Sequence, residues 1–534
     1  MIQSPDALAQ IDQGFETLGA LIGITLGPTQ GAVVNAREGG QPELLTDSGT
    51  IARRVVELPG RGENTGAMVL RNLVWTMRER HGDGAATAAV LARAMLHEAS
   101  RQIAAGANPT RMRAGVQRGV AAALPALAAQ ALPVAGQEAL AHFATGITGE
   151  AALGAMLGEL FDLLGEDAAI VIEEFASPHL DREYIDGGRW PARPAARALV
   201  PDGQSELSLD KPLVLAVNQS LQSVADVRQI LDLAASAPGT PPLLLVATGL
   251  TGDALAAVTM NHARGTLTIG AALLTGGGTS HGDNLDDIAL ITGGALVSEA
   301  RGLPPARLQP AAFGRARRAI LTRSQLTLLG GDGDRSLIQT RIDELRARAT
   351  AAGTTHADWE KLRLRIARLA GGIGVLKVGA STERQREATK ALAKKAVRVL
   401  GPALTEGLVP GGGVALLGCR SAVLAARESC PDADEVAGVE VVAAALAAPF
   451  NQLVQNHGVH TPAVALDAVD RLGPGHGLDV REGRYACMAE IGVLDSLAVV
   501  RAALQAAGSA AGIAMTTDVI VLPAEKRREV KVRP

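Results

Sequence analysis

The spacing of apolar residues predicts long helices in the first and last parts of the chain. Within residues 85–104, Leu91, Met95 and Ala99 recur every four positions, which places them on one face of an α-helix. The dipeptide Asn108-Pro109 is typical of a helix start, because proline is tolerated in the first helical turn. Further helices are predicted from the same kinds of signal at residues 67–80, 111–132, 382–399 and 413–427.

The middle of the chain has short continuous apolar runs instead. Residues 213–217 and 243–246 have the pattern of buried strands, and residues 224–237 between them have helical spacing. This order predicts a βαβ unit. Two more strands are predicted at 168–172 and 375–378, and a helical hairpin at 335–370 that turns near Gly353 and carries Trp359, Leu362, Ile366 and Leu369 on its second arm. Helical ends around a strand-rich middle predict a nested, multi-domain α/β architecture, with one domain built from both chain ends.

Composition narrows the class of protein. The 534 residues suffice for about three or four domains, and with 47% hydrophobic but only eleven aromatic residues the core must be Ala, Val, Leu and Ile. A net charge of −4 without a basic half argues against non-specific nucleic-acid binding. No uncharged apolar run of about 18 residues and no signal-peptide pattern are present, so we expect a cytoplasmic protein without a membrane span. The cysteines are too few for a disulfide framework or a zinc site and fit a reducing compartment; they are Cys419, Cys430 and Cys487.

Three glycine-flanked segments are candidates for phosphate binding. Backbone N–H groups at a helix start bind phosphate, and glycine lets the backbone approach closely. An aspartate between two glycines, such as Asp83, can hold Mg²⁺ beside the phosphates, and Asp47 could orient water or metal. The three segments are Thr25-Leu26-Gly27-Pro28, Gly82-Asp83-Gly84-Ala85-Ala86-Thr87 and Gly411-Gly412-Gly413.

Each candidate also has a purely structural interpretation. A lone Gly-Asp-Gly is usually a turn, three glycines before a helix are usually a flexible entry, and Asp47 is typical of a turn or an N-cap. No P-loop motif occurs. We interpret His457 and His460 as solvated, the cysteines as small core residues, and Trp190 as a packing residue rather than a binding aromatic.

Taken together and in order, these segments resemble the group I chaperonins of the GroEL type. The resemblance covers nearly the whole chain. The alternative, an unrelated small-molecule α/β enzyme, would require seven matches in the correct order to arise by chance. The segments that carry it are TLGPTQGAVV (25–34), TDSGTIARRVVEL (46–58), GDGAATAAVLARAML (82–96), AAGANPTRMRAGV (104–116), LAGGIGVLKVGASTE (369–383), EGLVPGGGVAL (406–416) and IGVLDS (491–496).

The resemblance implies a three-domain chaperonin-like fold. A helical equatorial domain would comprise 1–129 and 406–534, an intermediate hinge domain 130–187 and 374–405, and an inserted α/β apical domain 188–373. Gly187 and Gly371-Gly372 would be its hinges. The protein would then be an ATP-binding, ring-forming chaperone that encloses non-native polypeptides, with a co-chaperonin as a possible lid, and without nucleic-acid or membrane partners.

The resemblance also implies a nucleotide site. Asp83 matches the family's Mg²⁺-binding acid and Asp47 matches one of two acids tied to water activation. The positions that match nucleotide contacts are Thr25, Leu26, Gly27, Pro28, Gly82, Gly84, Thr87, Gly412 and Asp495, together with the altered positions Ala85, Ala86 and Asp479. Ala85 and Ala86 replace family threonines and Thr46 replaces a lysine, while Asp479-Val480-Arg481 replaces an Asn-Ala-Ala stretch near the base.

The largest departure concerns the second catalytic acid. Its position holds Lys395, and no Asp or Glu occurs from 388 to 405. A carboxylate there would orient and deprotonate the attacking water, which an ammonium cannot do. We therefore expect weakened but retained ATP binding and slow hydrolysis. Two functions stay open: an ATP-driven folding chaperonin with reduced turnover, and a catalytically weak paralogue that acts as a holdase or scaffold ring.

Two surfaces of the family are altered as well. Apolar stripes at helical spacing are candidates for polypeptide binding, although ordinary core faces have the same pattern; their residues are Val227, Ile230, Leu231, Leu255, Thr259 and Met260. The segment 191–200 has Ala, Pro and Arg in place of aromatic residues, which predicts weaker capture. Asn451 and Thr461 stand where the family has a ring-to-ring ion pair, so stacking of two rings is open.

Overall fold

The chain folds into two compact units, and the first of them combines both chain ends. In the computed structural model, unit 1 comprises Met1–Asp162 and Glu387–Pro534, and unit 2 comprises Leu163–Arg386. The described residues are 1–522 except 29–30, 37–41, 56, 135, 166–168, 201–205, 276–279, 351–357, 359–360, 363–364, 367, 370–371 and 460. The nested arrangement predicted from the sequence is confirmed. The unit boundaries fall inside both segments predicted as intermediate domain, so the three-domain division stays a prediction.

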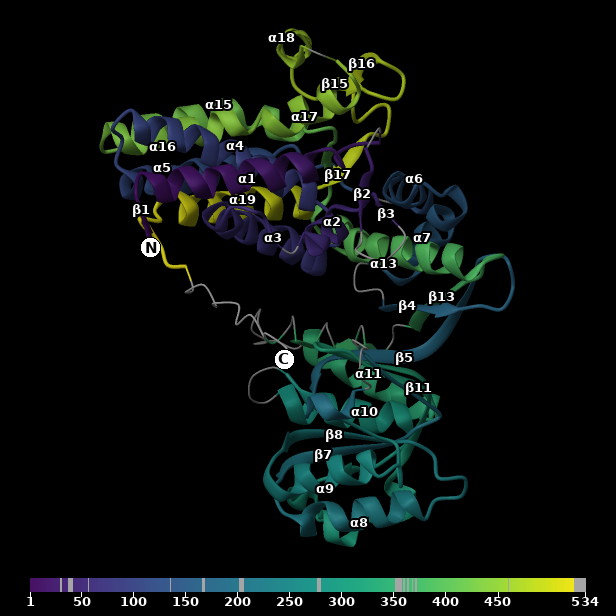
Figure 1. Ribbon diagram of the computed structural model, residues 1–534. Coiled ribbons are helices and arrows are strands. Elements are labelled where there is room, and N and C mark those ends of the chain that lie inside the picture. Colours follow the sequence, from purple (N-terminus) through teal and green to yellow (C-terminus); the bar gives the residue numbers. More distant parts are fainter. Residues whose placement is uncertain are drawn as a thin grey trace, which may run out of the picture. The chain divides into compact units, whose positions relative to one another are not determined.

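Unit 1 is mainly helical, and in its described residues four small two-stranded sheets are formed, most of them visible in Figure 1. Two helices cross the boundary between the units, α7 (Ala151–Leu164) and α13 (Glu383–Glu406). The other helices are α1 (Asp6–Gly23), α2 (Ser48–Arg54), α3 (Arg61–His81), α4 (Ala85–Ala104), α5 (Pro109–Ala128), α6 (Gln137–Thr148), α14 (Val414–Gly418), α15 (Arg420–Ala425), α16 (Ala433–Ala445), α17 (Ala448–Asn456), α18 (Pro462–Leu472) and α19 (Leu497–Met515). The sheets pair β1 (Ile2–Gln3) with β18 (Val519–Ile520), β2 (Val33–Asn35) with β3 (Glu43–Leu45), β14 (Leu408–Pro410) with β17 (Leu494–Ser496), and β15 (His476–Asp479) with β16 (Arg484–Cys487).

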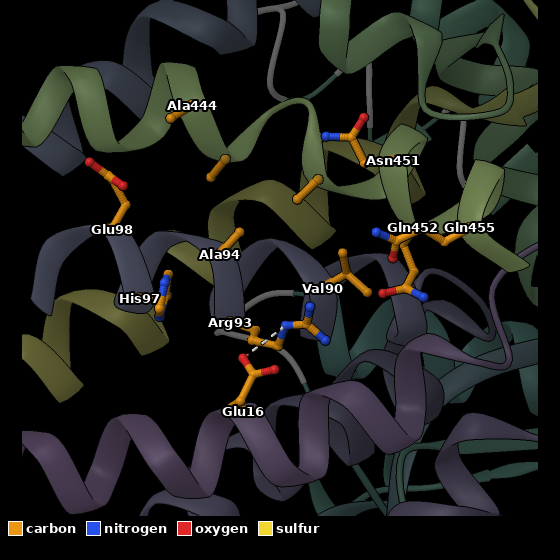
Figure 2. A pocket seen from close by; sticks show the side chains of 12 residues that line it. Glu16, Val90, Arg93, Ala94, His97, Glu98, Ala444, Asn451, Gln452 and Gln455 are labelled. Carbon is orange, nitrogen blue, oxygen red and sulfur yellow. Dashed lines mark ion pairs between the residues drawn. The ribbon is translucent and has the colours of Figure 1, made fainter. Parts of the chain in front are cut away.

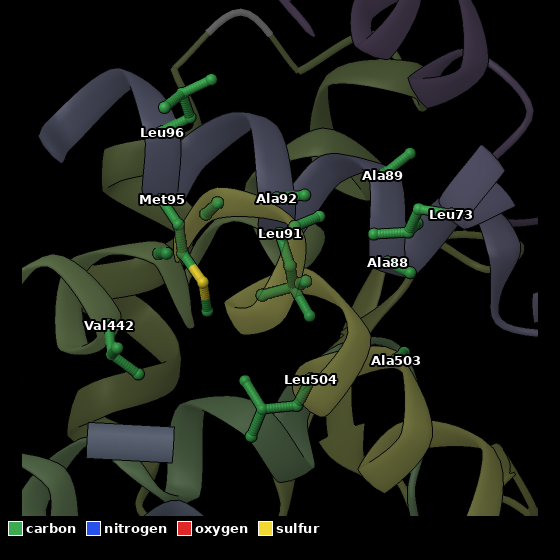
Figure 3. Packing of buried hydrophobic residues seen from close by; sticks show 14 of the residues in the cluster. Leu73, Ala88, Ala89, Leu91, Ala92, Met95, Leu96, Val442, Ala503 and Leu504 are labelled. Atoms are coloured by element: carbon green, nitrogen blue, oxygen red, sulfur yellow. The ribbon is translucent and has the colours of Figure 1, made fainter. Parts of the chain in front are cut away.

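The core of unit 1 forms around α4, as Figure 3 shows for its central part. Leu91, Met95 and Ala99 of the predicted stripe are fully buried, and they pack with residues of α16 and α19 from the other chain end. Small residues let the helices approach closely. A Cβ on Gly14 would lie 2.0 Å from a backbone oxygen of α3, and one on Gly438 would lie 2.1 Å from a backbone oxygen of α5.

Two stretches of this core are long and apolar enough to cross a membrane by length and composition alone. They are Ala433–Asn456 and Leu497–Met515, and 61% and 67% of their apolar windows are buried inside the structure. Burial of this kind is the ordinary state of core helices, which pass the same test.

Unit 2 is a mixed sheet covered by helices on both faces. Its strand order is β10-β7-β8-β9-β5-β12-β11-β6, with β13 joining β5 to β4. The strands are β4 (Ala169–Glu174), β5 (Asp181–Pro194), β6 (Leu207–Asp210), β7 (Leu213–Leu221), β8 (Leu243–Leu250), β9 (Ile269–Leu274), β10 (Leu296–Val297), β11 (Gly314–Leu321), β12 (Gln325–Gly331) and β13 (Gly372–Val378). The helices are α8 (Val224–Ala235), α9 (Gly252–Ala263), α10 (Ser280–Thr292) and α11 (Arg335–Thr350), besides the short 3-10 turns Arg197–Leu199, Glu299–Arg301, Pro305–Arg307 and Pro310–Ala312.

The two faces of this sheet follow from the alternation of side chains along its strands. In β7, Leu213, Leu215 and Val217 point to one face and pack with α8 and α9, while Val214 and Ala216 point to the other and pack with α10. β7, α8 and β8 form the predicted βαβ unit, with the two strands parallel. Figure 1 shows α10 on one side of these strands and α8 and α9 on the other.

Several single-residue predictions can be compared with this fold. Trp190 is fully buried in the sheet core, which confirms its packing role. The three cysteines are free thiols, and burial raises the pKa of Cys419 to about 11. The helix predicted at 413–427 is broken into α14, α15 and a 3-10 turn. Gly353, Trp359, Gly371 and His460 lie outside the described residues.

Candidate functional site

The loop Gly82-Asp83-Gly84 joins α3 to α4 in a backbone conformation that favours glycine. Gly82 has φ +74° and Gly84, which caps α4, has φ +76°. A Cβ on Gly84 would lie 2.6 Å from Val499 Cγ1, so the start of α19 packs directly against the start of α4. The N–H groups of the first turn of α4 have no intrahelical acceptor and can bind a phosphate. These groups belong to Ala85, Ala86 and Thr87.

Asp83 forms an ion pair with the lysine at the second-acid position. Lys395 Nζ lies 3.2 Å from Asp83 Oδ2, and both side chains are partly exposed. Helix α13 packs onto the loop, since a Cβ on Gly82 would lie 2.9 Å from Arg398 Cβ and 3.1 Å from the Lys395 carbonyl oxygen. Arg398 Nη1 also donates to the Arg78 carbonyl oxygen at 3.3 Å. The ion pair therefore joins two elements whose backbones already approach closely.

The residues around Asp83 fit a magnesium ion poorly. Mg²⁺ prefers an octahedral shell of oxygen ligands. Here Asp83 Oδ2, an oxygen that such an ion would use, is paired with the ammonium of Lys395. The Mg²⁺ expected at Asp83 from the sequence stays a prediction.

Asp495 is electrostatically coupled to this ion pair. Strand β17 places it opposite Val409 of β14. The protein packed around Asp495 and the negative charge of Asp83 raise its pKa to about 7, against the opposite effect of Lys395. The side chain is nevertheless exposed in the single chain, so this packing does not seal it from water. A carboxyl group that titrates near neutral pH can donate or accept a hydrogen bond, which suits a hydroxyl-bearing ligand.

The second glycine segment contacts the chain just before β17. Gly411 N–H donates to the Val493 carbonyl oxygen at 2.9 Å, and Gly413 caps α14 with φ +79°. A Cβ on Gly412 would have Met488 Sδ, at 3.9 Å, as its only neighbour within 4 Å among the described atoms, so the backbone there is open to a ligand. The segments 82–87 and 411–413 thus contact the chain at Val499 and Val493, after and before β17, and the shared phosphate and ribose site stays a prediction.

Asp479 lies on the hairpin of β15 and β16, near the same loop. Its Oδ1 accepts from the Arg481 N–H at 2.9 Å, which is the geometry of a turn residue. Gly477, two residues earlier, lies close to Val414 and Met488, since a Cβ there would be 2.5 Å from Val414 Cγ2. The hairpin thus borders the Gly412 region, while the Asp479 carboxylate is engaged within its own turn.

Thr25-Leu26-Gly27-Pro28 follows the end of α1 and is anchored by an asparagine from the other chain end. Asn456 Nδ2 donates to the carbonyl oxygens of Gly23 at 2.9 Å and Leu26 at 2.8 Å. The Thr25 hydroxyl donates to the Ile22 carbonyl oxygen at 2.7 Å, so it serves the helix end here. Sequence reasoning missed Asn456, because its partners are more than 400 positions away and no spacing rule connects them.

Asp47 is the N-cap of α2. Its Oδ2 accepts from the N–H and the hydroxyl of Thr50, both at 2.7 Å, and lies 3.2 Å from Arg78 Nη1. This is the structural role that the sequence left open. Arg78 was not a candidate, yet through its side chain and its carbonyl oxygen it links Asp47 to Arg398 on α13.

In unit 2, the predicted polypeptide-binding stripes divide into core and surface. Val227 and Ile230 are 1% and 0% exposed and pack against the sheet, which corrects the expectation that they face a client. Met260 is 49% exposed, and Val224, which sequence reasoning missed, is 51% exposed. Three other predicted positions are half-buried between these extremes: Leu231, Leu255 and Thr259.

A cavity of about 460 Å³, lined by charged, amide and apolar side chains, lies elsewhere in unit 1 (Figure 2). Arg93 from α4 and Glu16 from α1 form an ion pair of 3.3 Å in its lining. Asn451, the predicted ring-contact position, borders the cavity, and its Oδ1 is buried without a hydrogen-bond partner among the described residues. A signal for this cavity was present in the sequence, since Val90, Arg93, Ala94, His97 and Glu98 form one partly polar face of α4.

The chain resembles known proteins in sequence and in fold. A family model described as the TCP-1/cpn60 chaperonin family matches residues 18–173 and 216–525. Similar solved structures include the chaperonin gp146 from the bacteriophage EL 2 (Pseudomonas aeruginosa), determined in the presence of ATP-BeFx. Crystal form II has a TM-score of 0.76 at 17% identity, and form I has 0.67 at 18% identity. Each match covers 98% of this chain and 99% of that chain, and at such identities it shows the fold alone.

Proposed function

The chain belongs to the TCP-1/cpn60 chaperonin family, and we propose that it is an ATP-binding, ring-forming chaperone with slow ATP hydrolysis. The predicted multi-domain α/β chaperonin fold is confirmed, and a chaperonin-type role in protein folding follows from the family. Assignment to group I, a cytoplasmic location and a co-chaperonin lid are parts of the proposal that rest on the sequence.

The ion pair between Lys395 and Asp83 carries the proposal of slow hydrolysis. Attack of water on a γ-phosphate is faster when a carboxylate orients the water and accepts its proton. At the position expected for that carboxylate, this chain holds a charged ammonium within 3.2 Å of Asp83. The glycine loops and the backbone N–H groups at the start of α4 supply binding groups, so we expect binding without efficient turnover.

Paired measurements of nucleotide binding and turnover test this proposal. We expect calorimetry on the full chain to detect ADP and ATP binding, and steady-state turnover about 10²–10⁴-fold below that of an ordinary chaperonin. Turnover equal to that of an ordinary chaperonin would contradict slow hydrolysis, and absence of any adenine-nucleotide binding would overturn the proposal as a whole.

The alternative function is a holdase or scaffold ring that does not couple ATP to release. The Asp83–Lys395 pair and the loss of two threonines to Ala85 and Ala86 favour it. Release of a bound, unfolded client upon addition of ATP distinguishes the two functions, since a holdase would keep its client.

Client binding is proposed for the exposed side chains on α8 and α9. We expect Val224→Ser with Met260→Ser to reduce suppression of aggregation, because these exposed apolar side chains contribute contact area but no core packing. Thermal unfolding should stay within about 2 °C of wild type, as for surface substitutions.

Ile230→Ser is the matched control for the core side of the same helix. It should lower stability by roughly 2–5 kcal/mol, because it empties a fully buried position. Unchanged capture of unfolded clients by the double variant would contradict the assignment of this surface.

A further inference from the structure

The charge pair at the proposed nucleotide site has a consequence for metal use. We propose that the Lys395 ammonium takes the place of a divalent cation at Asp83, so that this chain binds its nucleotide without Mg²⁺. The proposal rests on nucleotide binding as proposed above and names the counter-ion that the site uses.

The position of Lys395 is fixed by backbone packing as well as by its side chain. The Gly82 Cα faces the Lys395 carbonyl oxygen and Arg398 Cβ so closely that a Cβ would lie 3.1 and 2.9 Å from them. Arg398 adds a hydrogen bond from Nη1 to the Arg78 carbonyl oxygen, at the end of α3 just before the loop. These contacts fix α13 against the loop and so place the base of the Lys395 side chain within reach of Asp83.

An ammonium in this position opposes a divalent cation. A cation that binds Asp83 would have to displace Lys395 Nζ from Oδ2 or lie a few ångströms from its like charge. Asp495 is the other carboxylate coupled to the pair, and the ammonium offsets one of the two negative charges that a divalent cation would meet.

The same ammonium can serve the phosphates. Lysine carries three N–H donors on a compact charge, and pairing with Asp83 Oδ2 uses one of them. The other donors can bind phosphate oxygens next to the N–H groups at the start of α4. A lysine thus bridges the acid and the phosphates, as a metal ion would. Its positive charge is part of the protein, so no bound cation is needed.

Nucleotide binding with and without divalent cation tests the proposal. ADP affinity of the full chain is measured by calorimetry in EDTA and in excess Mg²⁺, for wild type, Lys395→Met and Lys394→Met. Lys394 is the matched control, because it is an exposed lysine on the same helix one position away. For wild type, and likewise for Lys394→Met, we expect the ADP affinity in EDTA to be within about three-fold of the affinity in Mg²⁺. For Lys395→Met, we expect the ADP affinity to be about ten-fold or more weaker in EDTA and to recover in Mg²⁺.

A direct metal measurement gives a second readout. Without nucleotide, Mn²⁺ binding is followed by electron paramagnetic resonance. Wild type should show no Mn²⁺ site near Asp83, and Lys395→Met should show a new one. The double variant Lys395→Met with Asp83→Asn should lack that new site. Nucleotide binding by wild type only in the presence of Mg²⁺ would overturn the proposal and leave nucleotide binding intact. Absence of nucleotide binding in both conditions would overturn this proposal together with the function on which it rests.

Discussion

At the residue scale, the site differs from an efficient hydrolase site in its supply of proton acceptors. Asp47 caps α2 and pairs with Arg78, Asp83 pairs with Lys395, and Asp495 has a pKa near neutral. Each carboxylate is thus engaged or partly protonated. This arrangement is the reason for proposing capture of an anionic ligand with slow activation of water.

Lys395→Asp is expected to raise ATP turnover by about ten-fold or more, because it restores a carboxylate where a proton acceptor is needed. The new acid would stand beside Asp83, so turnover should also become dependent on Mg²⁺. Steady-state phosphate release with and without Mg²⁺ measures both effects. An unchanged rate in the folded variant would show that another feature of the site limits hydrolysis.

Asp495→Asn is expected to change how stability depends on pH. The pKa of Asp495 is raised from 3.8 to about 7, so the folded protein favours the protonated form and loses stability from this group as pH rises from about 4 to 7. The Asn variant lacks this loss. Its stability relative to wild type should therefore rise between about pH 4 and 7 and stay constant at higher pH. Urea unfolding midpoints at pH 4.5, 6 and 8 measure the difference. A difference that is the same at all three values would contradict the raised pKa.

At the element scale, the start of α4 depends on a glycine in close contact with α19. Gly84→Ala should lower the free energy of unfolding by about 2–4 kcal/mol. The left-handed backbone strains an alanine, and its Cβ would lie 2.6 Å from Val499 Cγ1. Gly106→Ala is the matched control. It has φ +108° but nothing within 4 Å of its Cβ among the described atoms, so it should cost only the backbone strain. Denaturant unfolding compares the two, and equal losses would show that the contact with α19 contributes nothing.

Elements with a strong local signal were predictable from the sequence. The bounds of α4 coincide with the predicted 85–104, and the βαβ unit of β7, α8 and β8 was recognised from two apolar runs and one helical stretch. The break between α14 and α15 was not, because Gly418 and Cys419 carry no strong stop signal and tertiary packing decides there.

The site was predictable only where its contacts are local. The glycine loops could be found from their motifs, whereas the links from Asn456 to Leu26 and from Arg398 to Arg78 join residues hundreds of positions apart. The apolar stripe of α8 could not be divided into core and client surface. Ile230 and Leu231 are adjacent and similar, and only the packed sheet shows which of them is covered.

At the scale of the whole molecule, the hairpin of β2 and β3 is a surface suited to self-association. Val34 and Leu44 are cross-strand partners and each is 64% exposed, while Leu45 on the opposite face is buried. A two-stranded sheet with an exposed apolar pair and unpaired edges gains stability from another chain. This feature supports the proposed ring without fixing its subunit number.

Val34→Asp with Leu44→Asp should therefore weaken ring assembly, because two carboxylates in an interface repel one another and must be desolvated. Mass photometry of the variant at sub-micromolar concentration should show dissociated subunits where wild type shows rings. Thr17→Asp on α1 is a control on an exposed hydroxyl elsewhere in the unit. Rings of equal stability in the double variant would remove the hairpin from the interface.

The combination of both chain ends in unit 1 has a consequence during translation. Residues of α4 and α5 complete their core only with α16 and α19, which leave the ribosome after Leu163–Arg386 has been made. At about 5–20 residues per second, synthesis of that segment alone lasts roughly 10–45 s, during which the faces of α4 and α5 that pack on α16 and α19 stay uncovered. The nascent chain therefore exposes apolar surface that needs shielding. Slow codons after residue 387 should lengthen this exposure and lower the yield of folded protein.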